Sequence, residues 1–263
     1  MADRSGIINQ ERLGLEKLNN QGSPMKIIEY IDSSNIIVEF QDKYKARVNA
    51  QYCNFQSGSI KNPYCPSVYG VGIVGNKHPI SINCIPTKEY AMWMNMLKRC
   101  FYKKIKDKQP TYREAICCDE WLLFDNFYEW LYSQENFERW KSGNRYALEK
   151  DILVKNNKVY SPETCCIVPQ NVNCLFLKRK ADRGDLPIGV RKNGKLFVAS
   201  CHNPFTNKAE RLGTYQTIDD AFQAYKRYKE YLIRQVAQIE YDNGNITEQC
   251  YKTMMEYEVE ITD

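Results

Sequence analysis

The stretch GVRKNGKLFVA at residues 189–199, followed by RLGTY at residues 211–215, decides the architecture of the last third of this chain. Asn193-Gly194 is a frequent hairpin dipeptide, so strands are predicted at 189–191 and 196–200, with a third at 210–214. Thr217 is the predicted N-cap of a helix that ends at Asn243-Gly244. The apolar stripe of this helix comprises Ile218, Ala221, Phe222, Tyr225, Leu232, Val236 and Ile239. The pattern predicts a three-stranded sheet followed by one helix.

These residues, together with Asp220-Ala-Phe-Gln-Ala-Tyr225, resemble the Apetala-two DNA-binding domain. The resemblance implies a sheet that enters the major groove of double-stranded DNA, with the helix packed behind it. Phe197 stands where the family often has Trp, and it is expected to fill the interface between sheet and helix. Arg191 is the best candidate for a guanine contact, because a guanidinium can donate to two acceptors at once. The expected DNA-binding residues are Arg191, Lys192, Lys195, Lys208 and Arg211, with Lys192 and Lys208 nearer to phosphate.

The distribution of charge agrees with a phosphate-binding surface. From Phe176 to Arg211 there are nine cations and three anions, a local charge of +6 against +5 for the whole chain. Clustered cations on a folded surface are what phosphate binding needs. The alternative interpretation is an ordinary solvated face, since exposed Lys and Arg are common. The segment from 243 to 263 is acidic by contrast.

The central segment carries a second resemblance. The stretches WMNMLKRCF (93–101), CDEWLLF (118–124), FYEW (127–130), LEKD (148–151) and NKVYSPETC (157–165) resemble phage H-N-H homing endonucleases. In that family a ββα core holds one divalent metal and a His activates water, while the metal stabilises charge on the phosphate. The resemblance places Glu149 at the acidic position, Lys150 where the His stands, Asn157 at the loop Asn and Asn173 at the helix ligand.

This segment departs from the family at the His. Only His78 and His202 occur in the chain, and both lie outside the motif. A lysine is protonated at neutral pH and is a poor general base, so Asp151 is expected to bind metal or act as a base instead. The predicted catalytic set is Glu149, Lys150, Asp151 and Asn157, with Mg²⁺ or Mn²⁺ held by Glu149, Asp151 and Asn173. Alternatively, Glu149 and Lys150 are solvated strand residues of an inherited scaffold.

The cysteine pattern argues against zinc. The pairs Cys117-Cys118 and Cys165-Cys166 are adjacent, and no C-x-x-C occurs. Neighbouring strand residues point to opposite faces, so a pair cannot easily direct both sulfurs at one ion. The odd count of eleven Cys in apolar stretches fits reduced, mostly buried thiols.

The first part of the chain is predicted to be mostly strand. Residues 1–20 are polar and are expected to be helical or loose. Strands are expected at 26–30, 36–40 and 44–48, close enough to form a small β-barrel like an SH3 domain. Residues 64–86 are interpreted as a linker with one short strand. After Thr87 a helix with Tyr90, Trp93, Met94, Leu97 and Phe101 on one side runs to Pro110, and a second helix begins near Asp119.

The chain is therefore predicted to be an α+β protein of three domains. These are a small N-terminal β-barrel with linker (1–86), a degenerate H-N-H-like ββα domain with flanking helices (87–182), and an Apetala-two type domain with C-terminal helices (183–263). No apolar run approaches the roughly 18 residues of a membrane span. The polar N-terminus has no signal peptide, so a cytoplasmic protein is expected, in a phage-infected bacterial cell by the resemblance.

Two functions follow from these patterns. The first is a double-stranded DNA-binding protein of the phage homing-endonuclease class that nicks DNA with a metal ion. The second is a catalytically inactive factor that binds DNA or protein, such as a transcription regulator or an inhibitor of a host defence nuclease. A protein partner would be bound through the N-terminal domain or the acidic C-terminal segment. The missing His favours the second function on mechanism.

Overall fold

The computed structural model describes residues 11–143, 145–177 and 184–263. The chain divides into two compact units, one reaching to Arg113 and including Cys117–Glu129, the other comprising Glu114–Ile116 and Trp130–Asp263. Helices and strands are mixed throughout, which confirms the α+β class, and the sheets are open. Part of the prediction for residues 1–20 lies outside the described residues, as do the cations Lys178, Arg179, Lys180 and Arg183.

The first unit begins with an open antiparallel sheet instead of the predicted barrel. Its order is β1 (Glu16–Leu18), β2 (Pro24–Asp32), β3 (Asn35–Phe40) and β4 (Arg47–Ala50). A barrel would need the two edge strands to pair, and β1 and β4 do not. The helix α2 (Tyr52–Ser57) contributes Phe55 to the apolar cluster that contains Met25, Ile27 and Phe40. Phe55 of α2 therefore covers part of the apolar face of this sheet, which in a barrel would be covered by other strands.

Two small hairpins stand where a linker with one strand was predicted. The first pairs β5 (Pro66–Val68) with β6 (Gly72–Ile73), and the second pairs β7 (Ser81–Ile82) with β8 (Ile85–Pro86). Strands this short show no period-two alternation, so the sequence pattern could not reveal them. Gly72 is required by packing, because a Cβ there would lie 2.5 Å from Leu97 Cδ1.

Helix α3 (Lys88–Phe101) is capped as predicted, since the Thr87 hydroxyl accepts from the Tyr90 N–H. It ends at Phe101, earlier than the predicted Pro110, because Tyr102 is extended and starts a separate helix α4 (Lys103–Lys108). A 3-10 turn at Pro110–Tyr112 follows. The predicted second helix is also split, into a 3-10 turn at Glu120–Leu122 and α5 (Phe124–Tyr132). Trp93, Trp121, Phe124 and Phe127 are fully buried, so these aromatic side chains form core.

The second unit contains the later part of the H-N-H-like segment, with the stretches 148–151 and 157–165, whereas the stretches 93–101 and 118–124 belong to the first unit. Strand β10 (Tyr146–Glu149) pairs antiparallel with β12 (Cys166–Pro169), and α7 (Gln170–Leu175) follows directly. Helix α7 buries Val172 and Leu175 in the core cluster that also contains Val168 of β12. The remaining short elements are β9 (Ile116–Cys117), α6 (Phe137–Lys141) and β11 (Val159–Tyr160).

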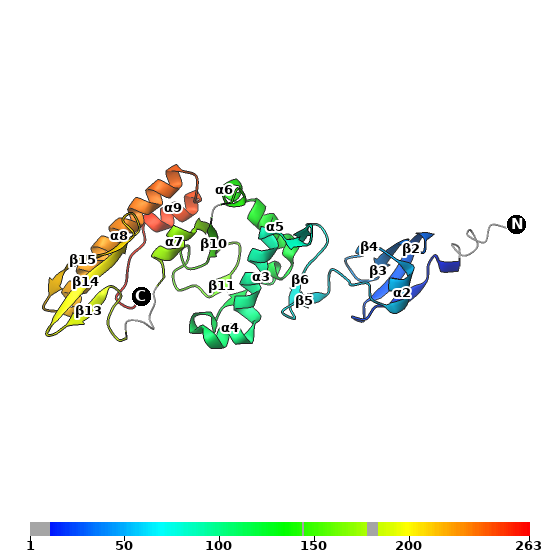
Figure 1. The fold of residues 1–263 in the computed structure, drawn as a ribbon, viewed down its shortest axis with the longest axis horizontal. Helices are drawn as coiled ribbons and strands as arrows, with labels where there is room; N and C mark the ends of the chain where they lie inside the picture. The colour runs from blue at the N-terminus through cyan, green and yellow to red at the C-terminus, as the bar shows by residue number, and fades with distance from the viewer. Residues whose placement is uncertain (1–10, 144, 178–183) are drawn as a thin grey trace. The chain divides into compact units, whose positions relative to one another are not determined.

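The last part of the chain is a three-stranded antiparallel sheet with one long helix. The strands are β13 (Val190–Asn193), β14 (Leu196–Asn203) and β15 (Lys208–Tyr215), in that spatial order, and α8 (Ile218–Asp242) packs along them (Figure 1). The predicted hairpin, the Thr217 cap and the helix end at Asn243 are confirmed. Strands β14 and β15 are longer than predicted, and α9 (Glu248–Met255) follows α8.

Two glycines set the close packing of this sheet. Gly189 has φ +76°, and a Cβ there would lie 2.0 Å from the Tyr225 ring of α8. Gly213 sits opposite Ala199 next to a bulge, with φ +153° and the Tyr215 hydroxyl 2.7 Å from where a Cβ would be. Glycine is the residue that tolerates both the conformation and the approach. In the described residues no helix is both long and apolar enough to cross a membrane.

Candidate nucleic-acid interface

The arginines Arg191 and Arg211 lie on the sheet face that turns away from α8. Side chains alternate along a strand, and Val190, Ala199 and Cys201 belong to the core cluster shared with α8. Arg191 follows Val190 in β13, and Arg211 pairs with Ser200 of β14, so both belong to the opposite face. Both side chains are exposed. Thr214, which accepts from the Arg211 guanidinium at 2.6 Å, is exposed on the same side.

The predicted lysines occupy the margins of the sheet. Lys192 pairs with Phe197, whose ring packs on the α8 side, and Lys208 pairs with Asn203 at the far end of the hairpin. Lys195 lies in the two-residue turn between β13 and β14. All three are exposed. The structure therefore gathers Arg191 and Arg211 on one face, whereas Lys192 and Lys208 belong by register to the α8 side and Lys195 lies in the turn. The five predicted DNA-binding residues do not share one face of the sheet. Phe197 is half-buried against the core cluster, as predicted.

A polar network that the sequence did not reveal fixes the β14–β15 end of the sheet. The Asn203 amide donates to Glu210 and to the Tyr228 hydroxyl, and Tyr228 of α8 also donates to Glu210. The hydrogen bond from Tyr228, followed by that from Asn203, lowers the pKa of Glu210. The side-chain oxygen Oδ1 of Asn203 accepts from the Phe205 N–H and closes the loop. An Asn directly before a turn is a sequence signal for a side-chain hydrogen bond to the turn backbone. The hydrogen bond from Asn203 to Glu210 could not be predicted, because it depends on the register of β14 and β15.

Glu149, at the end of β10, is turned toward its own backbone. Its Oε1 accepts from the N–H groups of Lys150 at 2.9 Å and Asp151 at 2.8 Å. Burial raises the pKa of Glu149, and the nearby Asp151 charge raises it further, while the two backbone hydrogen bonds oppose the shift. This carboxylate therefore organises the turn that follows β10.

Lys150 is buried, which overturns the alternative interpretation of this residue as a solvated strand residue. Its side chain is 8% exposed, and its ammonium donates to Asp151 Oδ1 at 2.7 Å and to the Asn157 carbonyl at 2.7 Å. Burying an ammonium without partners is costly, so these two contacts are what allow it to be buried. Both contacts hold the Lys150 side chain in the turn that follows β10.

Asn157 faces Lys150 across the loop, and both its side-chain nitrogen and its side-chain oxygen form hydrogen bonds. Its amide nitrogen donates to the carbonyls of Lys150 at 3.0 Å and Val159 at 2.6 Å, and its oxygen accepts from the Val159 N–H at 3.0 Å. The preceding Asn156 has φ +59°, a conformation that Asn tolerates better than most residues. The structure thus brings together the four predicted catalytic residues, Glu149, Lys150, Asp151 and Asn157. Their hydrogen bonds are made to one another and to the backbone of the same loop.

The predicted metal ligands Glu149 and Asp151 each engage one carboxylate oxygen within the protein. Glu149 Oε1 accepts from backbone N–H groups, and Asp151 Oδ1 accepts from the Lys150 ammonium. Asn173 is a half-buried residue of α7. Over the described ranges, no three His, Cys, Asp or Glu side chains gather as a metal site would require. Binding of Mg²⁺ or Mn²⁺ by Glu149, Asp151 and Asn173 stays a prediction.

The adjacent cysteines have separate surroundings. The Cys165 thiol forms hydrogen bonds with the backbone of Ser161 and the side chain of Thr164. Burial outweighs these bonds and raises the pKa of the thiol to about 12. Cys166 faces Cys250 of α9, and that contact together with burial raises the pKa of Cys166. A thiol held neutral in this way packs as a small apolar side chain.

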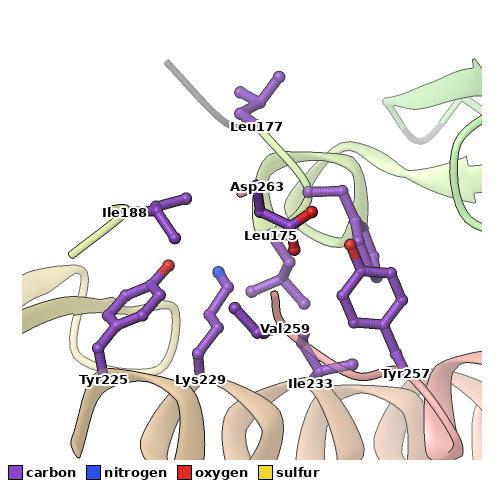
Figure 2. Close-up of a pocket in the computed structure, with 10 residues that line it drawn as sticks. Leu175, Leu177, Ile188, Tyr225, Lys229, Ile233, Tyr257, Val259 and Asp263 are labelled. Atoms are coloured by element: carbon purple, nitrogen blue, oxygen red, sulfur yellow. The ribbon is translucent and has the colours of Figure 1, made fainter. Parts of the chain in front are cut away.

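A small cavity in the second unit was not anticipated from the sequence. Figure 2 shows Tyr225 and Lys229 rising from α8 toward Ile188, with Leu175 and Tyr257 on the other side. The lining is mainly apolar, and burial lowers the pKa of Lys229. The acidic C-terminal segment packs beside it, since Val259 donates to Glu230 and Lys155 pairs with Asp263 at 3.1 Å.

Comparisons with protein-family models, with curated proteins and with solved structures give no match to this chain.

Proposed function

We propose that this protein binds double-stranded DNA, with the sheet β13–β15 lying in the major groove. The observation that carries the proposal is the exposure of Arg191 and Arg211 on the sheet face away from α8. The opposite face is filled by core, so this face is the one that the fold leaves available. The resemblance to Apetala-two domains supports the same orientation.

The chemistry of the face suits a duplex. A narrow sheet fits the major groove, and a guanidinium can donate to the O6 and N7 acceptors of guanine together. Lys195, in the turn between β13 and β14, would meet a phosphate at the margin of this face, which fixes position without reading sequence. Lys192 and Lys208 belong by register to the α8 side of the sheet, so the proposed face does not include them. Serine, threonine and histidine side chains on this face, at Ser200, His202 and Thr214, add further hydrogen-bonding groups.

The test compares Arg191→Ala/Arg211→Ala with Arg139→Ala/Arg227→Ala, a matched pair of exposed arginines on α6 and α8. Affinity for a labelled random-sequence duplex, and then for a selected site, is measured by fluorescence anisotropy. Each bidentate base contact contributes about 1–3 kcal/mol, so the first variant should lose roughly tenfold to a hundredfold or more on the selected site. Equal affinities for the two variants would overturn the proposal.

We further propose that the H-N-H-like segment is a scaffold that does not cleave DNA. Two contacts support this: the Lys150 ammonium bonds Asp151 and the Asn157 carbonyl, and the Asn157 amide bonds backbone on both sides. The order of β10, β12 and α7 agrees with the ββα order that the resemblance to H-N-H nucleases implies. The family's water-activating His has no counterpart in this loop.

A plasmid-nicking assay with Mg²⁺ or Mn²⁺ decides this second proposal. Wild-type protein is run beside Glu149→Ala, Lys150→Ala and Asp151→Ala. No nicking above the level of the buffer is expected for any of them. Metal-dependent nicking by the wild type that disappears in Glu149→Ala or Asp151→Ala would restore the nuclease interpretation.

A further inference from the structure

A second concentration of positive charge lies in the first compact unit. From Lys98 to Arg113 there are seven cations and one anion, a local charge of +6. The segment 176–211 of the second unit also carries +6, so the rest of the chain carries −7 against the net +5. The protein is therefore not generally basic, and each unit has its own positively charged region.

Helix α4 carries the exposed part of this charge. Lys103, Lys104 and Lys108 are exposed, and none of the three forms an ion pair with any carboxylate in the described part of the chain. The anion of the segment, Asp107, is exposed on the same helix. Three uncompensated ammonium groups within six residues create a positive potential that an anionic partner would relieve.

Helix stability does not account for Lys103 and Lys104. The N-terminal end of a helix carries partial positive charge, so cations in the first turn are unfavourable and acidic residues are preferred. Helix α4 has Lys103 and Lys104 in its first turn and no acidic residue there. By contrast, Lys98 and Arg99 occupy the last turn of α3, where the dipole favours them. The lysines of the α4 first turn are placed against local helix energetics.

We propose that the α4 surface, defined by Lys103, Lys104 and Lys108, binds the sugar-phosphate backbone of double-stranded DNA. This inference rests on the proposed DNA-binding function and adds a second contact surface to it. Ammonium groups are compact point charges without the fork geometry of arginine, so this surface binds phosphate and does not discriminate sequence. It adds affinity and salt dependence.

The experiment uses the full chain and a charge-matched control. Lys103→Gln/Lys104→Gln/Lys108→Gln is compared with Lys43→Gln/Lys45→Gln/Lys61→Gln, three exposed lysines of the same unit. Duplex affinity is measured across a series of KCl concentrations, and thermal unfolding confirms that both variants are folded. Each lost phosphate contact lowers the slope of log K against log[salt] by about 0.9, so the α4 variant should lose about 2–3 from the slope. The slope of the control variant should fall by less than about 0.9, the value for one phosphate contact. The preference for the selected site over random-sequence duplex should be unchanged in both variants.

The outcomes separate this inference from the proposed function. If Arg191→Ala/Arg211→Ala weakens binding while the α4 variant behaves like its control, the α4 surface is wrong and the sheet interface stands. If the α4 variant flattens the salt slope while the arginine variant binds normally, the α4 surface stands and the sheet interface fails. Absence of duplex binding by the wild type overturns both. Unchanged duplex binding with weakened binding to single-stranded RNA also overturns the α4 proposal.

Discussion

At the scale of single residues, the charges after β10 are held by short-range partners. Glu149 relies on two backbone N–H groups, and Lys150 relies on Asp151 and a carbonyl. Removing one partner of a buried polar group costs more than the hydrogen bond itself contributes, because the other partner stays buried. Substitutions in this turn therefore report on stability.

Glu149→Gln is expected to change how stability depends on pH. The raised pKa means that the folded state binds this proton more tightly than the unfolded state does. The contribution of Glu149 is thus largest in acid and is lost as pH rises from the ordinary value of 4.5 through the folded-state value. Glutamine keeps the acceptor oxygen without the charge, so the variant should gain relative stability as pH rises through this window. Urea unfolding at several pH values measures it.

Glu163→Gln serves as the control for that experiment. Glu163 is exposed, and the Ser161 hydroxyl lowers its pKa, so its contribution has the opposite sign. That contribution is present above the ordinary value and fades as pH falls. Equal pH dependence in Glu149→Gln and the wild type would contradict the burial of the Glu149 charge.

Gly189→Ala is expected to destabilise the sheet-helix packing strongly. The new Cβ would meet the Tyr225 ring at 2.0 Å and would sit at φ +76°. Strain and overpacking together should cost about 2–5 kcal/mol in the free energy of unfolding. Gly194→Ala is the matched control, with φ +61° and open space, and should cost only about 1–2 kcal/mol. Similar losses in the two variants would mean that the contact with Tyr225 is not tight.

At the scale of elements, the long helix α8 depends on its first turn. The Thr217 hydroxyl accepts from the Asp220 N–H at 3.1 Å and also contacts the Asp220 carboxylate at 2.7 Å. Asp219 and Asp220 are acidic residues at the positive end of the helix dipole. The helix in turn supplies Ala221, Phe222 and Tyr225 to the core under the sheet. Fraying of the first turn of α8 would therefore loosen the core that supports the sheet.

Thr217→Ala should lower the free energy of unfolding by about 0.5–2 kcal/mol, because one N–H of the first turn loses its acceptor. Thr217→Ser keeps a hydroxyl and should lose only a small part of that amount. Denaturant unfolding followed by circular dichroism measures both. Wild-type stability in Thr217→Ala would show that water replaces the cap without cost.

At the scale of the whole molecule, positive charge is divided between the two compact units. The segments 98–113 and 176–211 each carry +6 and belong to different units. Two surfaces that contact one duplex raise each other's effective concentration, so weak individual contacts still give appreciable affinity. The DNA-binding proposal thus concerns the full chain.

Combining Arg191→Ala/Arg211→Ala with the triple α4 substitution tests this division. The losses in binding free energy should add to within about 0.5 kcal/mol, because the altered residues share no partner within the protein. Anisotropy titrations at one salt concentration supply the four affinities of the cycle. A combined variant no weaker than the weaker parent would show that the two surfaces do not engage the same duplex.

Local patterns determined a large part of this protein. Asn193-Gly194 produced its hairpin, Thr87 and Thr217 capped their helices, and the apolar spacing in α8 placed Phe222 and Tyr225 in the core. These features depend on residues a few positions apart, which is the range over which turn chemistry and helical periodicity act.

Tertiary structure decided the rest. The N-terminal strands form an open sheet instead of the predicted barrel, because Phe55 of α2 packs against their apolar face. The sequence pattern predicted the strands but not this packing. Tertiary structure also buried Lys150 by bringing the Asn157 carbonyl to it, and it placed Arg191 and Arg211 on one face through a bulge that shifts the register of β15. Burial and register come from contacts between residues far apart in the chain, and no short window of sequence contains them.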